Sequence, residues 1–204
     1  MLFSAYFRGL SAAKKIALIA VFAALSIAVN YFSIDVTASN KIAFTYVVCF
    51  FAGWMLGGVP AFCIAFAGDA VGYLINPSGV YFLFGATLGV YALLMGVILN
   101  ARRKDAAPHA AAPYIRAAVA LAVGYLMVTV ILNTAVNYWY ALLFLWEGVA
   151  KKTFWVYFAG RIAFQSIVYA ANTAICIVLV PLLVQIGKKY EKRRKQTDAV
   201  RGQP

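Results

Sequence analysis

Residues 42–56 read IAFTYVVCFFAGWML and residues 61–75 read AFCIAFAGDAVGYLI, with Gly57-Gly58-Val59-Pro60 between them. The first stretch holds no charged side chain, and the second holds only Asp69. Glycine and proline in the short connection end one helix and start the next. A hydrocarbon core about 30 Å thick takes roughly 20 helical residues, and fewer where neighbours cover the helix ends. The pattern therefore predicts two membrane helices joined by a tight turn.

Four more apolar stretches flank this pair and complete a set of six predicted spans. Their boundaries are about 16–31, 42–56, 59–75, 80–100, 115–140 and 158–186. The turn Asn76-Pro77-Ser78-Gly79 separates the third from the fourth, and the polar segment 101–113 separates the fourth from the fifth. We therefore predict an all-α membrane protein, a bundle of six transmembrane helices. It forms a single integral membrane domain over residues 1–204, in which residues 187–204 are a basic cytoplasmic tail.

The composition supports this fold class. Of the 204 residues, 65% are hydrophobic and only 12% are charged, whereas a soluble domain is about half apolar and a quarter charged. The stretches outside the apolar segments are too short to bury a core of their own. A separate soluble catalytic domain is therefore excluded, and the chain acts within the bilayer.

The net charge of +12 is explained by topology. Lys and Arg are retained on the cytoplasmic side of membrane proteins. With the N-terminus inside, 14 of the 18 basic residues fall on that side. The four that do not are Lys41, Lys151, Lys152 and Arg161. This split predicts cytoplasmic termini and an even number of spans, and it makes nucleic acid an unsuitable partner.

The reactive residues needed for most enzymes are missing. His109 is the only histidine and lies in the charged loop between the fourth and fifth spans, so a Ser-His or His-pair active site within the membrane is excluded. Cys49, Cys63 and Cys176 are odd in number and lack metal-binding spacing. The chain also has no G-x-x-x-x-G-K-[ST] phosphate loop. The sequence predicts no enzyme and no metal or other cofactor, and active transport would need a partner or an ion gradient.

Ionisable and amide side chains inside the predicted spans are the candidate site. Asp69 lies about 9 Å below the outer end of the third span, and Arg161 enters the sixth span at a comparable depth. Asn133 and Asn137 share one face of the fifth span at a spacing of four residues. Asp69 and Arg161 could simply neutralise each other and fix helix packing. The same groups would also suit a polar ligand that enters from outside, and some of the many aromatic residues at this level could stack on a flat ring.

A stripe of small residues marks the first span. Ala13, Ala17, Ala20, Ala24 and Ala28 recur at close to one-turn spacing. Small residues let a second helix approach closely, and spacing alone is equally compatible with packing inside the chain.

Four sequence features together resemble one known family, the substrate-binding S components of energy-coupling factor (ECF) vitamin transporters, and within it the folate group. They are Ala20-x-x-x-Ala24 after Lys14-Lys15, GDAVGYLINPSG at residues 68–79, Leu132-Asn133-Thr134 and Gly160-Arg161-Ile162. The resemblance implies a six-helix subunit of the bacterial cytoplasmic membrane that captures a vitamin, folate in this group, from outside with high affinity. It also implies a membrane scaffold (T) subunit and two cytoplasmic ATPase subunits that drive release, with Ala20 and Ala24 docking on the scaffold.

Folate chemistry fits the candidate residues. An ionised carboxylate such as Asp69 can accept two hydrogen bonds from a pterin edge, and Asn133 and Asn137 offer donors and acceptors to the same ring. Aromatic rings suited to stacking are Tyr73, Tyr81 and Trp139, and basic residues suited to the glutamate carboxylates are Lys41, Lys151, Lys152 and Arg161.

Three other functions remain open at the level of the sequence. The ligand could be a different vitamin. A small channel or ion-coupled transporter would use Asp69 and Arg161 as an ion or proton relay. A purely structural membrane subunit would use the same two residues only as a pair.

Overall fold

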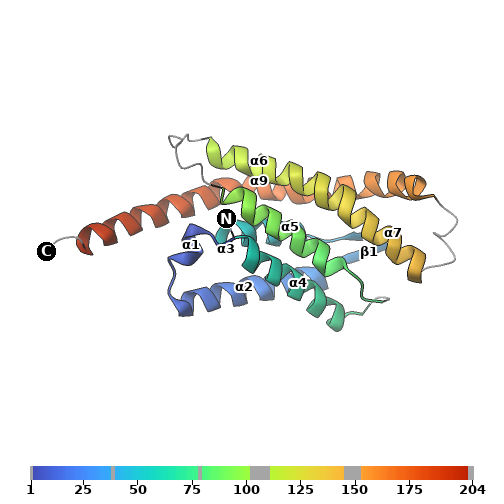
Figure 1. The fold of residues 1–204 in the computed structure, drawn as a ribbon, viewed down its shortest axis with the longest axis horizontal. Helices are drawn as coiled ribbons and strands as arrows, with labels where there is room; N and C mark the ends of the chain where they lie inside the picture. The colour runs from blue at the N-terminus through green and yellow to red at the C-terminus, as the bar shows by residue number, and fades with distance from the viewer. Residues whose placement is uncertain (1, 38–39, 78–79, 102–110, 145–152, 202–204) are drawn as a thin grey trace.

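The computed structural model describes residues 2–37, 40–77, 80–101, 111–144 and 153–201, in which the secondary structure is helical apart from one short hairpin. The helices run along one long axis, and the C-terminal helix continues past the others (Figure 1). In the described part of the chain, four helical segments are long and apolar enough to cross a membrane: Ala12–Tyr31, Gly58–Ile75, Ala112–Phe144 and Phe154–Tyr190. Thr45–Leu56 and Phe84–Leu99 are shorter apolar helices. The chain is a multi-pass membrane protein.

The helical elements follow the predicted apolar segments closely. In chain order they are α1 (Ala5–Arg8), α2 (Ala12–Tyr31), α3 (Thr45–Leu56), α4 (Gly58–Ile75), α5 (Phe84–Leu99), α6 (Ala112–Val123), the π-helix η1 (Gly124–Leu132), α7 (Asn133–Phe144) and α9 (Phe154–Arg201). The segments α6, η1 and α7 are continuous and together form the predicted fifth span.

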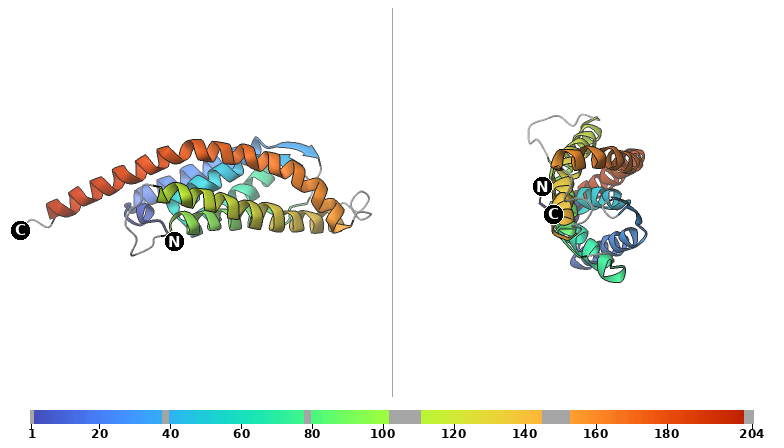
Figure 2. Two further views of the ribbon diagram at one scale, coloured as in Figure 1. Left: turned by 90° about the horizontal axis from the view of Figure 1, so that it is seen from above. Right: turned by 90° about the vertical axis from the view of Figure 1, so that its right-hand side faces the viewer.

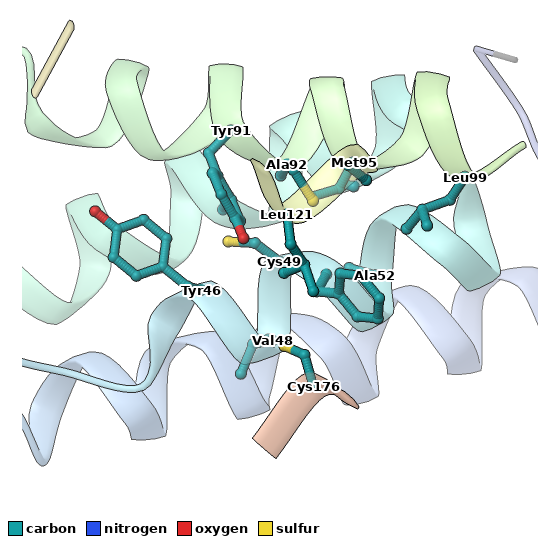
Figure 3. Packing of buried hydrophobic residues seen from close by; sticks show 14 of the residues in the cluster. Tyr46, Val48, Cys49, Ala52, Tyr91, Ala92, Met95, Leu99, Leu121 and Cys176 are labelled. Atoms are coloured by element: carbon teal, nitrogen blue, oxygen red, sulfur yellow. The ribbon is translucent and has the colours of Figure 1, made fainter. Parts of the chain in front are cut away.

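Helices α3, α4 and α5 form the centre of the core. Phe50 of α3 is fully buried, as are Tyr91 and Met95 of α5. Figure 3 shows Tyr91 and Met95 in this core. Glycines allow this close approach: a Cβ on Gly96 would lie 2.3 Å from the backbone nitrogen of Gly58, and one on Gly53 would lie 2.7 Å from that of Gly96. Because no hydrophobic force drives helices together inside lipid, such small-residue contacts hold a membrane bundle together.

One part of the fold is not helical. Strands β1 (Ile34–Thr37) and β2 (Asn40–Ile42) pair antiparallel, with Ile34 opposite Ile42 and an irregularity between Asp35 and Thr37. The sequence predicted only helices, so this hairpin was not expected. The predicted second span begins at residue 42, but in the structure Ile42 is still part of β2 and pairs with Ile34 of β1. Its β-branched residues favour extended backbone, so helix α3 begins only at Thr45.

The last helix is longer than predicted. The sixth span was expected to run from about 158 to about 186, but α9 extends from Phe154 to Arg201 and contains Pro181. Lys, Glu, Arg and Gln after residue 187 favour helix, and no proline follows before the end of α9. These last turns project beyond the other helices (Figures 1 and 2). The basic tail is therefore a continuation of the helix in which the chain last crosses the bundle.

The N-terminal segment closes one end of the bundle. Ser4 donates through its backbone nitrogen to the carbonyl of Leu56 (3.0 Å) and through its hydroxyl to that of Met55 (2.5 Å), and Val59 donates to the carbonyl of Leu2 (3.1 Å). Those carbonyls end α3, and the Val59 amide begins α4, so these groups have no partner within their own helices. Gly57 joins the two helices with φ +100°, and a Cβ there would lie 2.6 Å from the Cα of Phe3. Only glycine fits this turn.

Candidate functional site

Tyr46 lies at the centre of a buried polar cluster built from three separate parts of the chain. It stands in the first turn of α3 and is only 9% exposed. Its hydroxyl accepts a hydrogen bond from the side chain of Asn133 at 3.4 Å. Asn137, one turn further along α7, donates to both the backbone carbonyl and the side-chain oxygen of Asn133 at 2.8 Å. These bonds fix which way the Asn133 amide points.

Helix α9 brings the cationic member of this cluster. Arg161 is only 5% exposed, and its charge acts on the phenol groups of Tyr157, on its own helix, and Tyr46. Gln165, one turn below Arg161, is also buried. We call Tyr46, Asn133, Asn137 and Arg161 the Tyr46 cluster. It unites three residues expected from the sequence with one, Tyr46, that was not among the predicted site residues.

Tyrosine rings lie beside the Tyr46 cluster. The ring of Tyr46 lies 4.8 Å from that of Tyr91 and 5.4 Å from that of Tyr169, both edge-on (Figure 3 shows Tyr46 and Tyr91). The Tyr169 hydroxyl donates to the carbonyl of Leu121 at 2.7 Å, in the turn just before the π-helix η1. The same ring lies 5.1 Å from that of Tyr125. Rings locked in this way give the cluster a rigid aromatic support.

Asp69 belongs to a second group on other helices. Its carboxylate accepts a hydrogen bond from the Tyr81 hydroxyl at 3.2 Å, and the rings of Tyr81 and Tyr73 lie 5.1 Å apart. A Cβ on Gly85 would lie 2.4 Å from the Tyr81 hydroxyl and 3.2 Å from the Asp69 oxygen. The pair therefore lies against the first turn of α5, where a negative charge is favoured by the helix dipole. The hydrogen bond between Asp69 and Tyr81 therefore connects α4 to the segment that leads into α5.

The other predicted site residues are placed as follows. Trp139 lies on an exposed face of α7, at 59% exposure, away from the buried Asn137 two residues before it. Lys41 is in β2, opposite Asp35 in the hairpin register. Lys151 and Lys152 lie outside the described residues, as does His109. Asp69, Tyr73 and Tyr81 thus form one group, Asn133, Asn137 and Arg161 form another around Tyr46, and Trp139 belongs to neither.

The alanine stripe of α2 faces away from the other helices. Only Phe22 and Ser26 of this helix are buried. A Cβ on Gly68 of α4 would lie 2.1 Å from the Ser26 hydroxyl, so the face that holds Ser26 packs inward. Ala20 and Ala24 are exposed, because residues two positions away on a helix point in nearly opposite directions. Packing inside the chain therefore does not account for them.

Comparison with solved structures shows a familiar fold. A crystal structure of FolT bound with folic acid superposes with a TM-score of 0.63 and 20% sequence identity, covering 84% of this chain and 97% of that chain. At this identity the likeness concerns the fold. No curated protein sequence matches the chain significantly.

Comparison with family models identifies the family. The model of the ECF-type riboflavin transporter S component matches residues 11–189, which is most of the chain. The predicted relationship to vitamin-transporter S components is thereby confirmed, and a channel or a purely structural subunit is not favoured. The Tyr46 cluster and the exposed alanine face belong to a transporter subunit, a class that is not enzymatic. The chain is a member of the ECF-type riboflavin transporter S component family.

Proposed function

We propose that this chain is the high-affinity folate-binding subunit of an ECF-type importer. The observation that carries the choice of vitamin is Arg161, a buried cation within electrostatic range of Tyr46, whose hydroxyl accepts from Asn133. Folate carries two carboxylates, whereas riboflavin is uncharged. Burying a guanidinium is costly, and an anionic ligand offsets that cost through charge-assisted hydrogen bonds.

Different parts of folate contact the two groups of residues, which are the Tyr46 cluster and the group formed by Asp69, Tyr73 and Tyr81. Asn133 and Asn137 offer amide donors and acceptors to the pterin, and Asp69 accepts from its amino edge, with Tyr73 or Tyr81 against the ring face. Arg161 takes a glutamate carboxylate, and Lys41 in the hairpin takes the other. Trp139 serves as a stacking residue only if the ligand reaches the exposed face of α7. The likeness of the fold to that of FolT bound with folic acid supports folate as the ligand.

The chain crosses the bacterial cytoplasmic membrane six times, with both termini inside. The spans are α2, α3, α4, α5, the unit α6–η1–α7, and α9 up to about residue 186, and the tail 187–204 is cytoplasmic. Supporting this topology, the turns that would lie inside carry most of the Lys and Arg. Tyr46, Asn133 and Arg161 then lie in the outer halves of their spans, so capture occurs from outside.

Release requires partners, because the sequence has no nucleotide-binding loop. We assign these as a membrane scaffold (T) subunit and two cytoplasmic ATPase subunits. The exposed face of α2 that contains Ala20 and Ala24 is the docking surface for the scaffold, since small side chains permit close helix contact.

Riboflavin is the second candidate, favoured by the description of the matching family. Its flat ring could stack against the tyrosines of the site and hydrogen-bond to Asn133 and Asn137. It would leave Arg161 without an anionic ligand group.

The deciding experiment is a titration of the purified chain with folate, riboflavin and a panel of other vitamins, followed by the fluorescence of its four Trp. We expect saturable binding of folate with one site per chain. Arg161→Gln should weaken folate binding on the order of tenfold or more, as expected for a buried charged hydrogen bond, whereas Arg116→Gln, the same change on α6, should not.

A second pair of variants tests Asp69. Asp69→Asn should weaken folate binding, and Asp198→Asn, the same change at the far end of α9, should leave it intact. Saturation by riboflavin and not by folate, unaffected by Arg161→Gln, would reject folate and keep the S component assignment. If no vitamin saturates a chain shown to be folded by circular dichroism, both candidates fail.

A further inference from the structure

Two basic segments from opposite ends of the sequence meet at one end of the bundle. The ring of Tyr6, in α1, packs edge-on against that of Tyr190, in α9, with centroids 4.8 Å apart. A Cβ on Gly9 would lie 1.9 Å from the Tyr190 hydroxyl, so the chain after α1 also touches Tyr190. The contact places Arg8 beside the stretch of α9 that carries Lys188, Lys189 and Lys192.

The start of α2 extends this positive surface. The Lys15 ammonium lies 5.8 Å above the ring of Phe7, a buried residue of α1. Lys14 precedes it in the first turn of α2. We define the basic cluster as Arg8, Lys14, Lys15, Lys188, Lys189 and Lys192. All are exposed except Lys15, which is half-buried. The sequence has no acidic residue before Asp35, and Glu191 is the one acidic residue among these segments.

The level of the basic cluster along the helices identifies its ligand. Lys14 and Lys15 stand in the first turn of an apolar helix, and Lys188 follows Ile186, the last residue of an apolar run, by two positions. Their side chains therefore lie where the apolar span ends, at the depth of lipid headgroups. Leu2 and Phe3 beside them are exposed and apolar, and Tyr6 and Tyr190 are of the residue type that prefers the membrane interface.

We infer that the basic cluster binds the headgroups of anionic phospholipids of the inner leaflet, and that it needs both chain ends to do so. Clusters of four to eight Lys and Arg directly beside a membrane helix attract the headgroups of anionic lipids. The contact between Tyr6 and Tyr190 gathers the two halves into one site. A partner protein with an acidic surface would instead contact the turns of α9 beyond residue 192, because these turns project further from the bilayer.

Native mass spectrometry of the detergent-purified full chain with phosphatidylglycerol and phosphatidylcholine tests this inference. Phosphatidylglycerol should bind on the order of tenfold more tightly. Lys14→Gln/Lys15→Gln and Lys188→Gln/Lys189→Gln should each reduce its affinity on the order of tenfold, because each pair belongs to one shared site. Arg116→Gln removes one charge from α6, outside the basic cluster, and should have little effect.

A variant that changes no charged residue tests whether the contact between Tyr6 and Tyr190 is needed to bring the two chain ends together. Tyr6→Ala should lower the affinity for phosphatidylglycerol while leaving every basic residue in place, and Tyr6→Phe, which keeps the ring contact, should preserve it. Equal binding of the two lipids, or loss in only one of the double variants, overturns the inference. Displacement of phosphatidylglycerol by inorganic phosphate would indicate a small-anion site. Unchanged lipid selectivity in both double variants, with lost binding of the ATPase subunits, would assign the surface to a protein instead.

Discussion

The hydroxyl of Tyr91 lies 3.1 Å from that of Tyr169, and it must be the donor, because Tyr169 gives its own proton to the carbonyl of Leu121. This relay joins α5 to α9 and α9 to α6 across the middle of the bundle. Both phenols are buried.

The direction of this relay predicts unequal effects of removing each hydroxyl. Tyr169→Phe leaves the buried Tyr91 proton without its partner and removes the Tyr169 bond to the Leu121 carbonyl, which still accepts from the Gly124 amide. These losses should lower the free energy of unfolding by about 1–3 kcal/mol. Tyr91→Phe leaves the bond to Leu121 in place and should cost about 0.5–1.5 kcal/mol. Unfolding in detergent with both single variants and the double variant measures the difference. Equal losses would contradict the assigned donor.

The contact between α4 and α5 predicts that a single methyl group at Gly96 is not tolerated. A Cβ there meets the backbone of Gly58 at 2.3–2.4 Å, and neither backbone can move without separating the helices. Gly96→Ala should cost about 1–3 kcal/mol or more, seen as a lower thermal midpoint and aggregation in size-exclusion chromatography. Gly187→Ala is the control, because nothing lies within 4 Å of its added Cβ. A stable Gly96→Ala would mean that the helices are further apart.

The N-terminal segment predicts that one of two similar serines matters for stability. The Ser4 hydroxyl donates to Met55 and accepts from the Phe7 amide at 2.9 Å, whereas Ser11, which precedes α2, makes no side-chain cap. Ser4→Ala should therefore lower the free energy of unfolding by about 1–2 kcal/mol. Ser11→Ala should change it little. Thermal unfolding of both variants compares them directly, and equal midpoints would show that the segment does not stabilise the bundle.

The exposed alanine face predicts a separation of binding from transport. Ala20→Trp or Ala24→Trp should leave vitamin affinity unchanged, since neither residue packs against the rest of the chain. ATP-driven uptake with the partner subunits should be lost, because the bulky ring blocks close approach of the scaffold helix. Ile19→Trp, on a different face of α2, should retain uptake. Loss of vitamin binding in the alanine variants would instead place this face in the site.

The positions of the helices could be predicted from the sequence, because each apolar segment is bounded by charges, glycines or prolines. The tight connection between α3 and α4 is the clearest case, with Gly57 as the turn residue. The hairpin was missed although Ile34, Val36 and Thr37 are β-branched, because a ten-residue link between spans also suits a loop. The π-helix that begins at Gly124 has no comparable signal in the sequence.

The candidate site could be predicted only in its residue types. Asn133 and Asn137 are four residues apart, so helical spacing predicted that their side chains lie close together on one face. Tyr46 is 87 residues from Asn133, and nothing local in the sequence indicates that the two meet. Asp69 and Tyr81 are joined by a bond that depends on how the chain turns between α4 and α5. Pairings of this kind are set by tertiary packing.

The single-residue turn at Gly57 also has a consequence for how the chain enters the membrane during synthesis. Helix α3 has 12 residues, about 18 Å of helix, which is too short to cross a hydrocarbon core alone. An isolated short helix would leave backbone ends unsatisfied in lipid. Because α4 follows after one residue, we expect the two helices to insert together as a hairpin, with the longer α4 carrying the shorter α3 into the bilayer. The order of insertion is then set by the turn as much as by hydrophobicity.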